Sequence, residues 1–170
     1  MNNAVQEQTG RRGAGRTCRF AGHLRVRPAA SAEAKELAGL FADPQRGLRA
    51  VRALEAGRAM ALVAERFAER TWVPVGLTVT AADGETVLAL YPGERGRGLA
   101  PEVLRAALRG LREEPFTELS AFIETDDARA ATVFEKAGFA PAGSCRFRGR
   151  TSTRFVRNLR GDCTPYNVWI

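Results

Sequence analysis

A glycine-rich turn between an apolar run and an amphipathic helix constrains the fold more than any other feature of this sequence. Residues 86–90 read Thr-Val-Leu-Ala-Leu, residues 91–98 contain three glycines and two arginines, and residues 99–111 carry apolar side chains at helical spacing. In a strand–turn–helix unit of this kind, backbone N–H groups converge at the helix N-terminus, where the helix dipole adds partial positive charge. The turn therefore predicts a phosphate or pyrophosphate site, and Arg95 and Arg97 would strengthen the attraction.

Length and composition indicate one globular domain. The chain has 170 residues, of which 45% are hydrophobic and 26% charged. Its sequence shows no run long enough to cross a bilayer and no secretory signal in residues 1–20. Cys18, Cys145 and Cys163 are odd in number and form no CxxC pair, so we expect neither structural disulfides nor a metal site. These features favour a cytoplasmic protein without a membrane partner.

The charge balance is strongly basic. A formal net charge of +7, nearly all from arginine, favours anionic partners. The densest arginines lie in residues 1–22, which we expect to be a flexible basic tail ahead of a domain over residues 23–170. Scattered arginines without a recognition motif predict only non-specific binding to nucleic acid.

Hydrophobic periodicity and turn residues predict the order of the elements. Strands are expected at residues 24–27, 59–67, 72–80, 85–91 and 119–123, and helices at residues 32–41, 47–57, 99–111 and 128–137. Pro74 predicts an edge or a bulge, and residues 82–84 a hairpin turn. Asp127 is the expected cap of the last helix, with Gly138 in a left-handed conformation beyond it. Residues 144–159 predict a hairpin around Gly149, which completes one mixed α/β domain.

Two segments in this order resemble the signatures of a known superfamily. Arg-Gly-Arg-Gly-Leu-Ala at residues 95–100 is similar to the acetyl-CoA-binding turn of the GCN5-related N-acetyltransferases (GNAT superfamily). Residues 127–139, an Asp followed by a helix that ends in Glu-Lys-Ala-Gly-Phe, resemble the second signature of that superfamily. Within it, residues 98–104 and 133–139 look most like the branch that acetylates the N-termini of ribosomal proteins, and residues 40–44 also fit that branch.

The resemblance implies a single GNAT-type domain with a mixed, mostly antiparallel sheet flanked by helices. It implies a splayed pair of strands, residues 88–91 and 119–123, that admits the pantetheine arm of acetyl-CoA. It assigns cofactor contacts to Leu90, Tyr91, Arg95, Gly96, Arg97, Gly98, Leu99, Ala100, Asp127, Ala130 and Phe134. For Asp127 the helix cap is favoured over direct cofactor contact. Phe134 stands where many members carry a tyrosine acid, so we expect it to pack along the pantetheine.

Candidates for the chemistry are less sharply defined. Glu85 lies on the strand where related enzymes often carry a general base, although its place directly after Asp83 and Gly84 favours a solvated hairpin residue. Glu124 and Asp126 are alternatives. Tyr91 is interpreted either as a hydrogen-bond donor near the acetyl group or as a packing residue.

The resemblance implies an acetyl-CoA-dependent N-acetyltransferase, in which a primary amine attacks the thioester directly in a ternary complex. The acceptor is a protein or peptide N-terminus or a small amine, and the enzyme a monomer or homodimer. Two alternatives stay open: a CoA-binding module without catalysis, and a basic protein that docks on RNA or the ribosome. His23 and Cys145 are interpreted as a surface residue and a small buried residue.

Overall fold

The computed structural model describes residues 18–20, 24–30, 33, 36, 39–41 and 44–160. The predicted tail over residues 1–17, His23, and Cys163 with the rest of residues 161–170 lie outside this part. So does most of the helix expected at residues 32–41.

Five strands form an antiparallel sheet in the order β1-β2-β3-β4-β5. They are β1 (Cys18–Phe20), β2 (Leu24–Pro28), β3 (Ala59–Ala68), β4 (Thr71–Ala81) and β5 (Thr86–Leu90). Residues 18–20 were expected in the tail, but their backbone pairs with β2, with Cys18 opposite Val26. The alternation of residues 18–20 is too short to be recognised in the sequence as a strand.

The bulge expected from Pro74 is present. The register of β3 against β4 shifts between Ala64 and Glu65, which pair with Gly76 and Pro74. Val75 lies between these two partners and instead accepts a hydrogen bond from the Tyr91 N–H at 3.1 Å. The bulge lets proline occupy an inner strand, because β5 pairs with β4 only from Gly76 onward.

Three further strands form a second antiparallel sheet in the order β6-β8-β7. They are β6 (Glu118–Glu124), β7 (Ala140–Phe147) and β8 (Arg150–Asn158). The β7–β8 hairpin turns at Arg148 and Gly149, whose φ angles are 53° and 82°, so the predicted hairpin around Gly149 is confirmed. β8, the last strand in the described residues, lies between β6 and β7.

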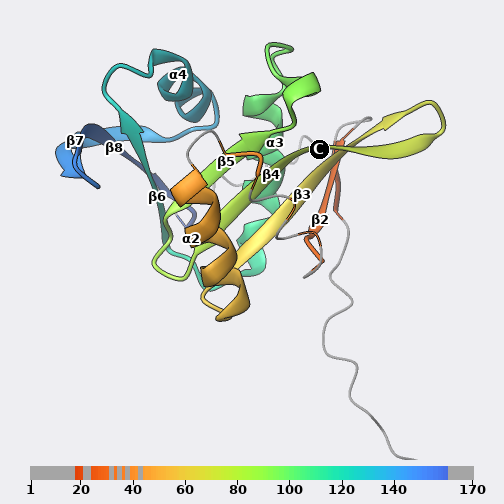
Figure 1. Cartoon of the computed structure of the whole chain (residues 1–170), viewed down its shortest axis with the longest axis horizontal. Helices are drawn as coiled ribbons and strands as arrows, with labels where there is room; N and C mark the ends of the chain where they lie inside the picture. The colour runs from red at the N-terminus through yellow and green to blue at the C-terminus, as the bar shows by residue number, and fades with distance from the viewer. Residues whose placement is uncertain are drawn as a thin grey trace, which may run out of the picture.

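The two sheets meet at one point and then separate. Glu85 and Ser120 form an isolated parallel bridge, and the Ser120 N–H donates to the Gly84 carbonyl at 2.9 Å. Beyond this vertex β5 and β6 run in the same direction and spread apart (Figure 1). The splayed strand pair implied by the resemblance is therefore present.

Gly84 makes the close approach at the vertex possible. Its φ is +86°, and a Cβ atom there would lie 2.5 Å from the Glu118 carbonyl oxygen. Any other residue would meet both the left-handed backbone conformation and the neighbouring strand.

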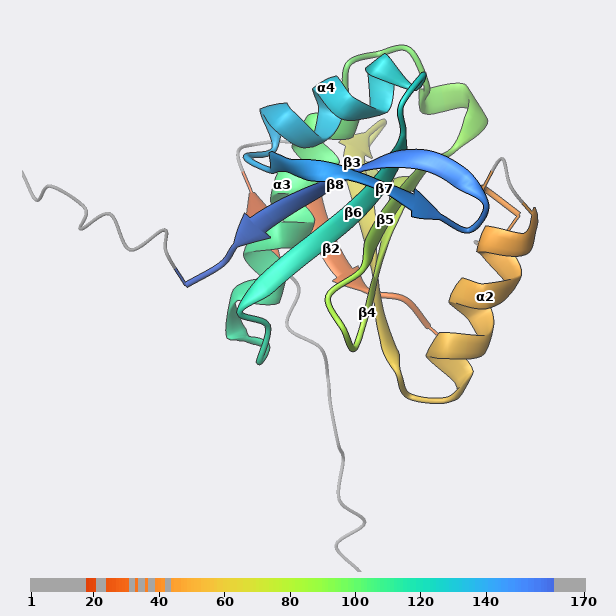
Figure 2. The ribbon, with the colours of Figure 1, turned by 90° about the vertical axis from the view of Figure 1, so that its left-hand side faces the viewer.

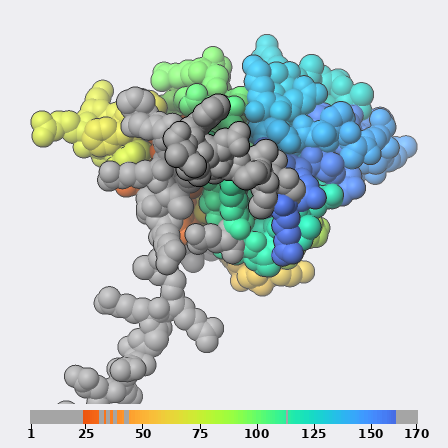
Figure 3. Space-filling view, turned by 180° about the vertical axis from the view of Figure 1, so that it is seen from behind, coloured from red at the N-terminus to blue at the C-terminus, as the bar shows by residue number. Residues whose placement is uncertain are grey.

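Helices cover both faces of the five-stranded sheet. Figure 2 shows α2 (Pro44–Glu55) and α3 (Ala100–Gly110) on opposite sides of it, with α4 (Ala128–Lys136) over the splayed end. Seen from behind in Figure 3, the β3–β4 hairpin projects from the end of the molecule away from β7 and β8. Two one-turn 3-10 helices, η1 (Pro92–Glu94) and η2 (Leu111–Glu113), flank α3.

The core follows this layering. The apolar stripe predicted for residues 99–111 is buried at Val103, Leu104, Ala107, Leu108 and Leu111. The last four of these pack with Phe134 and with side chains of β6 and β8, while Val103 packs with residues of β2, β3 and β4. A separate cluster on the other face gathers Phe41, Val63, Leu77 and Ala89 beside α2. Rigid layers on both faces therefore hold β5 in place, so its free edge has a fixed position.

Candidate functional site

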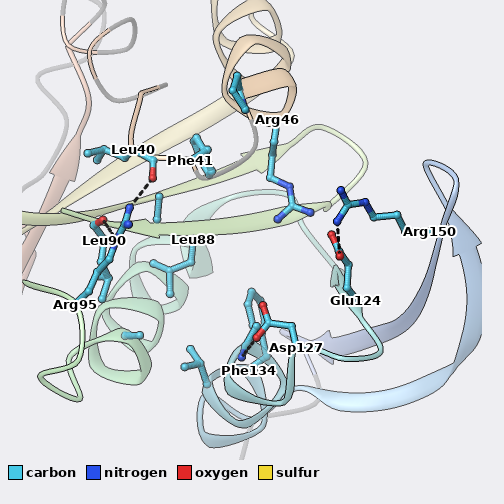
Figure 4. Close-up of a pocket in the computed structure, with 15 residues that line it drawn as sticks. Leu40, Phe41, Arg46, Leu88, Leu90, Arg95, Glu124, Asp127, Phe134 and Arg150 are labelled. Carbon is cyan, nitrogen blue, oxygen red and sulfur yellow. Dashed lines mark hydrogen bonds and ion pairs between the residues drawn. The ribbon is translucent and has the colours of Figure 1, made fainter. Parts of the chain in front are cut away.

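A cavity of about 640 Å³ occupies the fork between β5 and β6. β5 contributes Leu88, Ala89 and Leu90 to its wall, and α4 contributes Ala130, Val133 and Phe134. Charged side chains reach it from three directions, as Figure 4 shows: Arg46 from α2, Arg95 from the glycine-rich turn, and the Glu124–Arg150 pair from β6 and β8. Its size is within the range of small-molecule and cofactor sites.

The glycine-rich turn opens α3 beside this cavity. Gly96 and Gly98 have φ angles of +74° and +75°, and a Cβ atom on either would meet no atom within 4 Å. The N-cap residue Leu99 makes no side-chain hydrogen bond to the first turn of α3. The first N–H groups of a helix have no intrahelical acceptor, so this N-terminus can receive an anion.

α4 begins differently. The Asp127 side chain accepts a hydrogen bond from the Ala130 N–H at 2.9 Å, which confirms the predicted cap. Gly138 has the expected left-handed conformation (φ +87°) beyond the end of the helix. Between α3 and α4, a protein side chain therefore caps only the N-terminus of α4.

The Arg95 side chain is hydrogen-bonded to backbone carbonyl groups. Its Nε donates to the Leu90 carbonyl at 3.1 Å and its Nη2 to the Leu40 carbonyl at 2.9 Å. The guanidinium group therefore ties the end of β5 to residue 40 and closes that end of the cavity. Arg97 is more exposed and lies 3.5 Å from Glu94. The phosphate role predicted for both arginines stays a prediction.

The free edge of β5 presents backbone groups to the fork. The Tyr91 N–H bonds to β4, and antiparallel pairing alternates, so the backbone N–H and C=O groups of Leu88 and Leu90 point away from β4. They face the side on which β6 has diverged. An extended ligand in the fork could bond to them as an added strand would.

Phe134 is a packing residue. It is 6% exposed, lies against the cavity and meets Phe139 edge-on with ring centroids 5.1 Å apart. Its ring has no proton to give, so it supplies an apolar wall.

The two residues proposed for chemistry lie away from the main cavity. Tyr91 packs with the apolar cluster beside α2. Burial raises the pKa of its hydroxyl, and the carboxylates of Glu33 and Glu36 act in the same direction. Glu85 lines a smaller neighbouring hollow, where its carboxylate accepts a hydrogen bond from Arg148 at 3.1 Å. Burial raises the pKa of Glu85, and the nearby Arg148 charge opposes that rise.

Glu124 is the glutamate that lines the cavity. It ends β6, at the wide part of the fork, and binds Arg150 at 2.6 Å. The sequence named it as an alternative to Glu85. The vertex explains the difference between them, because Glu85 lies where the strands touch and Glu124 where they are apart.

The cavity thus gathers six of the residues predicted to bind the cofactor, and others that were not predicted. The six are Leu90, Arg95, Ala100, Asp127, Ala130 and Phe134; Tyr91, Gly96, Arg97, Gly98 and Leu99 do not line it. Leu88 and Ala89 lie in the strand segment 88–91 that the resemblance assigned to the pantetheine arm. The lining residues that were not predicted are Leu40, Phe41, Pro44, Arg46, Val133 and Arg150. No sequence signal placed α2 or the β7–β8 hairpin beside the fork.

Comparison with known proteins agrees with this geometry. A sequence model of the acetyltransferase (GNAT) domain matches residues 23–140. Over 62 residues, 36% of this chain, the sequence is 39% identical to mycothiol acetyltransferase of Beutenbergia cavernae; the match spans about a fifth (21%) of that relative's length.

Solved structures with the same fold include spermidine N-acetyltransferase from Vibrio cholerae in complex with CoA and spermine. It has a TM-score of 0.62 and 16% identity over 81% of this chain and 96% of that one. The Vibrio cholerae spermidine/spermine N-acetyltransferase in complex with manganese ions has a TM-score of 0.62 and 14% identity, over 81% and 93% of the two chains.

None of the helices in the described residues is long and apolar enough to cross a membrane. The GNAT match covers well over half of the chain and includes the strand, turn and helix that border the fork. With splayed strands, an uncapped helix N-terminus behind a glycine turn and a cavity between them, the chain belongs to the GNAT acetyltransferase family.

Proposed function

We propose that this protein is an acetyl-CoA-dependent N-acetyltransferase that transfers the acetyl group directly to a primary amine. The observation that carries the proposal is the cavity in the fork, which joins the uncapped N-terminus of α3 to the free edge of β5. One elongated ligand could bind to both features, with a pyrophosphate at the N-terminus of α3 and an amide-bearing chain along the free edge of β5.

The cofactor would bind through backbone groups. The pyrophosphate of CoA meets the N–H groups at the start of α3, where Gly96 and Gly98 leave space for close approach. The pantetheine amides pair with Leu88 and Leu90, and Phe134 packs on the other side of the arm. Since Arg95 already bonds to two carbonyls, its part here is to hold the β5 end of the site in shape.

The chemistry then needs a neutral amine close to the thioester carbonyl. We propose Glu124 as the group that takes the amine proton, directly or through a water, because its carboxylate lines the cavity and that of Glu85 does not. The amine forms the new C–N bond, and the CoA thiolate leaves. Backbone N–H groups of β5 stabilise the charge on the carbonyl oxygen, and proximity supplies much of the remaining acceleration.

The test is release of free thiol from acetyl-CoA with a panel of primary amines, together with calorimetric binding of acetyl-CoA. We expect turnover in the wild type. Glu124→Gln should lose about 100-fold or more in kcat with acetyl-CoA affinity kept. Glu85→Gln, the matched carboxylate outside the cavity, should lose less than Glu124→Gln. Tight acetyl-CoA binding without thiol release across the panel would instead establish a CoA-binding module without catalysis.

A further inference from the structure

Arginines crowd the side of the fork that faces α2. Three adjoining hollows share this region, and Arg46 lines all of them. Arg46 and Arg49 come from α2, while Arg148 and Arg150 come from the β7–β8 hairpin on the opposite side. These elements are far apart in the sequence, and Figure 2 shows the tip of the hairpin reaching toward the N-terminal end of α2.

The carboxylates in this region do not balance the arginines. Glu85 pairs with Arg148 at 3.1 Å and Glu124 with Arg150 at 2.6 Å. All four arginines line the hollow between α2 and the hairpin, where Glu124 is the acidic residue among the lining side chains. The Arg46 side chain makes no hydrogen bond or close ion pair within the part of the chain that the structure describes, and its charge acts on Glu85 through space. Its half-buried side chain points from α2 toward the Glu124–Arg150 pair (Figure 4).

The position of Arg46 is also unfavourable for its own helix. Arg46 is the third residue of α2, whose first turn contains no acidic residue. A cation in the first turn opposes the helix dipole, typically at a cost of about 0.3–1 kcal/mol. An anion bound between α2 and the hairpin would offset this repulsion, because it would face the helix N-terminus and the Arg46 guanidinium together.

From this arrangement we infer that the acceptor is a primary amine with an acidic side chain next to it, whose side-chain carboxylate is held by Arg46 beside the Glu124–Arg150 pair. The inference rests on the proposed N-acetyltransferase function. The acceptor amine lies at the thioester in the fork, and its carboxylate lies on the α2 side. A free acidic amino acid and a peptide with an acidic residue next to its N-terminus both have this chemistry. A polyamine does not, since its additional positive charges would face the excess of arginine.

The experiment measures thiol release from acetyl-CoA with matched acceptors. Glutamate is compared with glutamine, and an N-terminal Ser-Glu peptide with the same peptide carrying Ser-Gln, with spermidine as the cationic acceptor. We expect kcat/KM for at least one acidic member to exceed that of its amide by about 10-fold or more, with spermidine slowest. The acidic acceptor with the higher kcat/KM shows whether the substrate is a free amino acid or a peptide.

The variant Arg46→Gln should reduce the acid-over-amide ratio to less than about threefold, because kcat/KM for the acidic acceptor falls more than that for its amide, mainly through KM. Arg52→Gln is the matched control: it removes one positive charge from the same helix, on the face that lines a different groove, and should keep the preference. Equal use of acids, amides and spermidine by the wild type would overturn the inference while leaving the N-acetyltransferase in place. An equal loss of kcat/KM with the acidic acceptors and with their amides in Arg46→Gln would also overturn the inference. Absence of thiol release with every acceptor would overturn the proposed function, and this inference with it.

Discussion

Replacing Gly84 by alanine tests whether the vertex of the fork is set by contact between the two strands. The alanine Cβ would lie 2.5 Å from the Glu118 carbonyl oxygen, whereas ordinary contacts begin at 3.4 Å. The backbones of β5 and β6 would have to separate by about 0.9 Å, because neither group is a flexible side chain that can turn away. The hydrogen bond from Ser120 to the Gly84 carbonyl, now 2.9 Å, would lengthen with this separation.

The magnitude follows from three contributions. A left-handed φ of +86° costs a residue with a Cβ about 1–2 kcal/mol. Weakening the Ser120–Gly84 hydrogen bond costs about 1 kcal/mol, and the residual crowding adds to these. We expect Gly84→Ala to lose about 2–4 kcal/mol of unfolding free energy, and its Tm to fall by about 5–15 °C.

The control is Gly57→Ala. Gly57 also has a left-handed φ of +66°, but no atom lies within 4 Å of a Cβ built there. It therefore measures the cost of the backbone conformation alone, about 1–2 kcal/mol. Urea and thermal unfolding of both variants give the comparison. If Gly84→Ala is no less stable than Gly57→Ala, contact at the vertex does not hold the strands, and the reasoning fails.

Three further predictions concern groups around the site. Asp127→Ala removes the bond to the Ala130 N–H and should lower the unfolding free energy by about 1 kcal/mol, measured by urea unfolding, with acetyl-CoA affinity changing less than about threefold; a large loss of affinity at unchanged stability would instead make Asp127 a cofactor ligand. Phe134→Ala should cost about 3–5 kcal/mol of unfolding free energy, because the ring is 6% exposed in the core, and a loss under 1 kcal/mol would contradict its packing role. The Arg27 guanidinium lowers the pKa of Glu33 from 4.5 to about 2, so this ion pair contributes stability above pH 4.5 that is lost as the pH falls toward 2. Unfolding followed between pH 6 and 2 should show a shallower loss for Glu33→Gln than for the wild type, and identical slopes would refute the assignment.

Much of the fold could be predicted because its signals are local. The turn at residues 91–98, the apolar stripe of α3 and the Asp127 cap each depend on residues a few positions apart, and the structure has all three. The Pro74 bulge follows from a residue that has no backbone N–H to donate, and the β7–β8 hairpin from a glycine that readily adopts a left-handed conformation.

The arrangement of the site depends on contacts between residues that are far apart in the sequence, and local sequence patterns do not reveal such contacts. Glu85 and Glu124 are both acidic residues at a strand end, and only the parallel bridge at the vertex shows that Glu124 lies where the strands have separated. Arg95 matched a phosphate-binding signature, yet its partners include the carbonyl of Leu40, a residue 55 positions earlier in the chain. Arg46 lay just before the helix predicted at residues 47–57, whereas α2 begins at Pro44, and no local pattern indicated that the fold places the β7–β8 hairpin opposite Arg46.

A crystal structure of the protein with bound CoA tests the central claim most directly. We expect the diphosphate at the first turn of α3, in contact with backbone nitrogens of residues 96–100, and the pantetheine chain between Leu88 and Phe134 with its sulfur near Glu124. CoA bound at another place on the surface, with the fork between β5 and β6 vacant, would contradict the claim that this cavity is where the acetyl group is transferred.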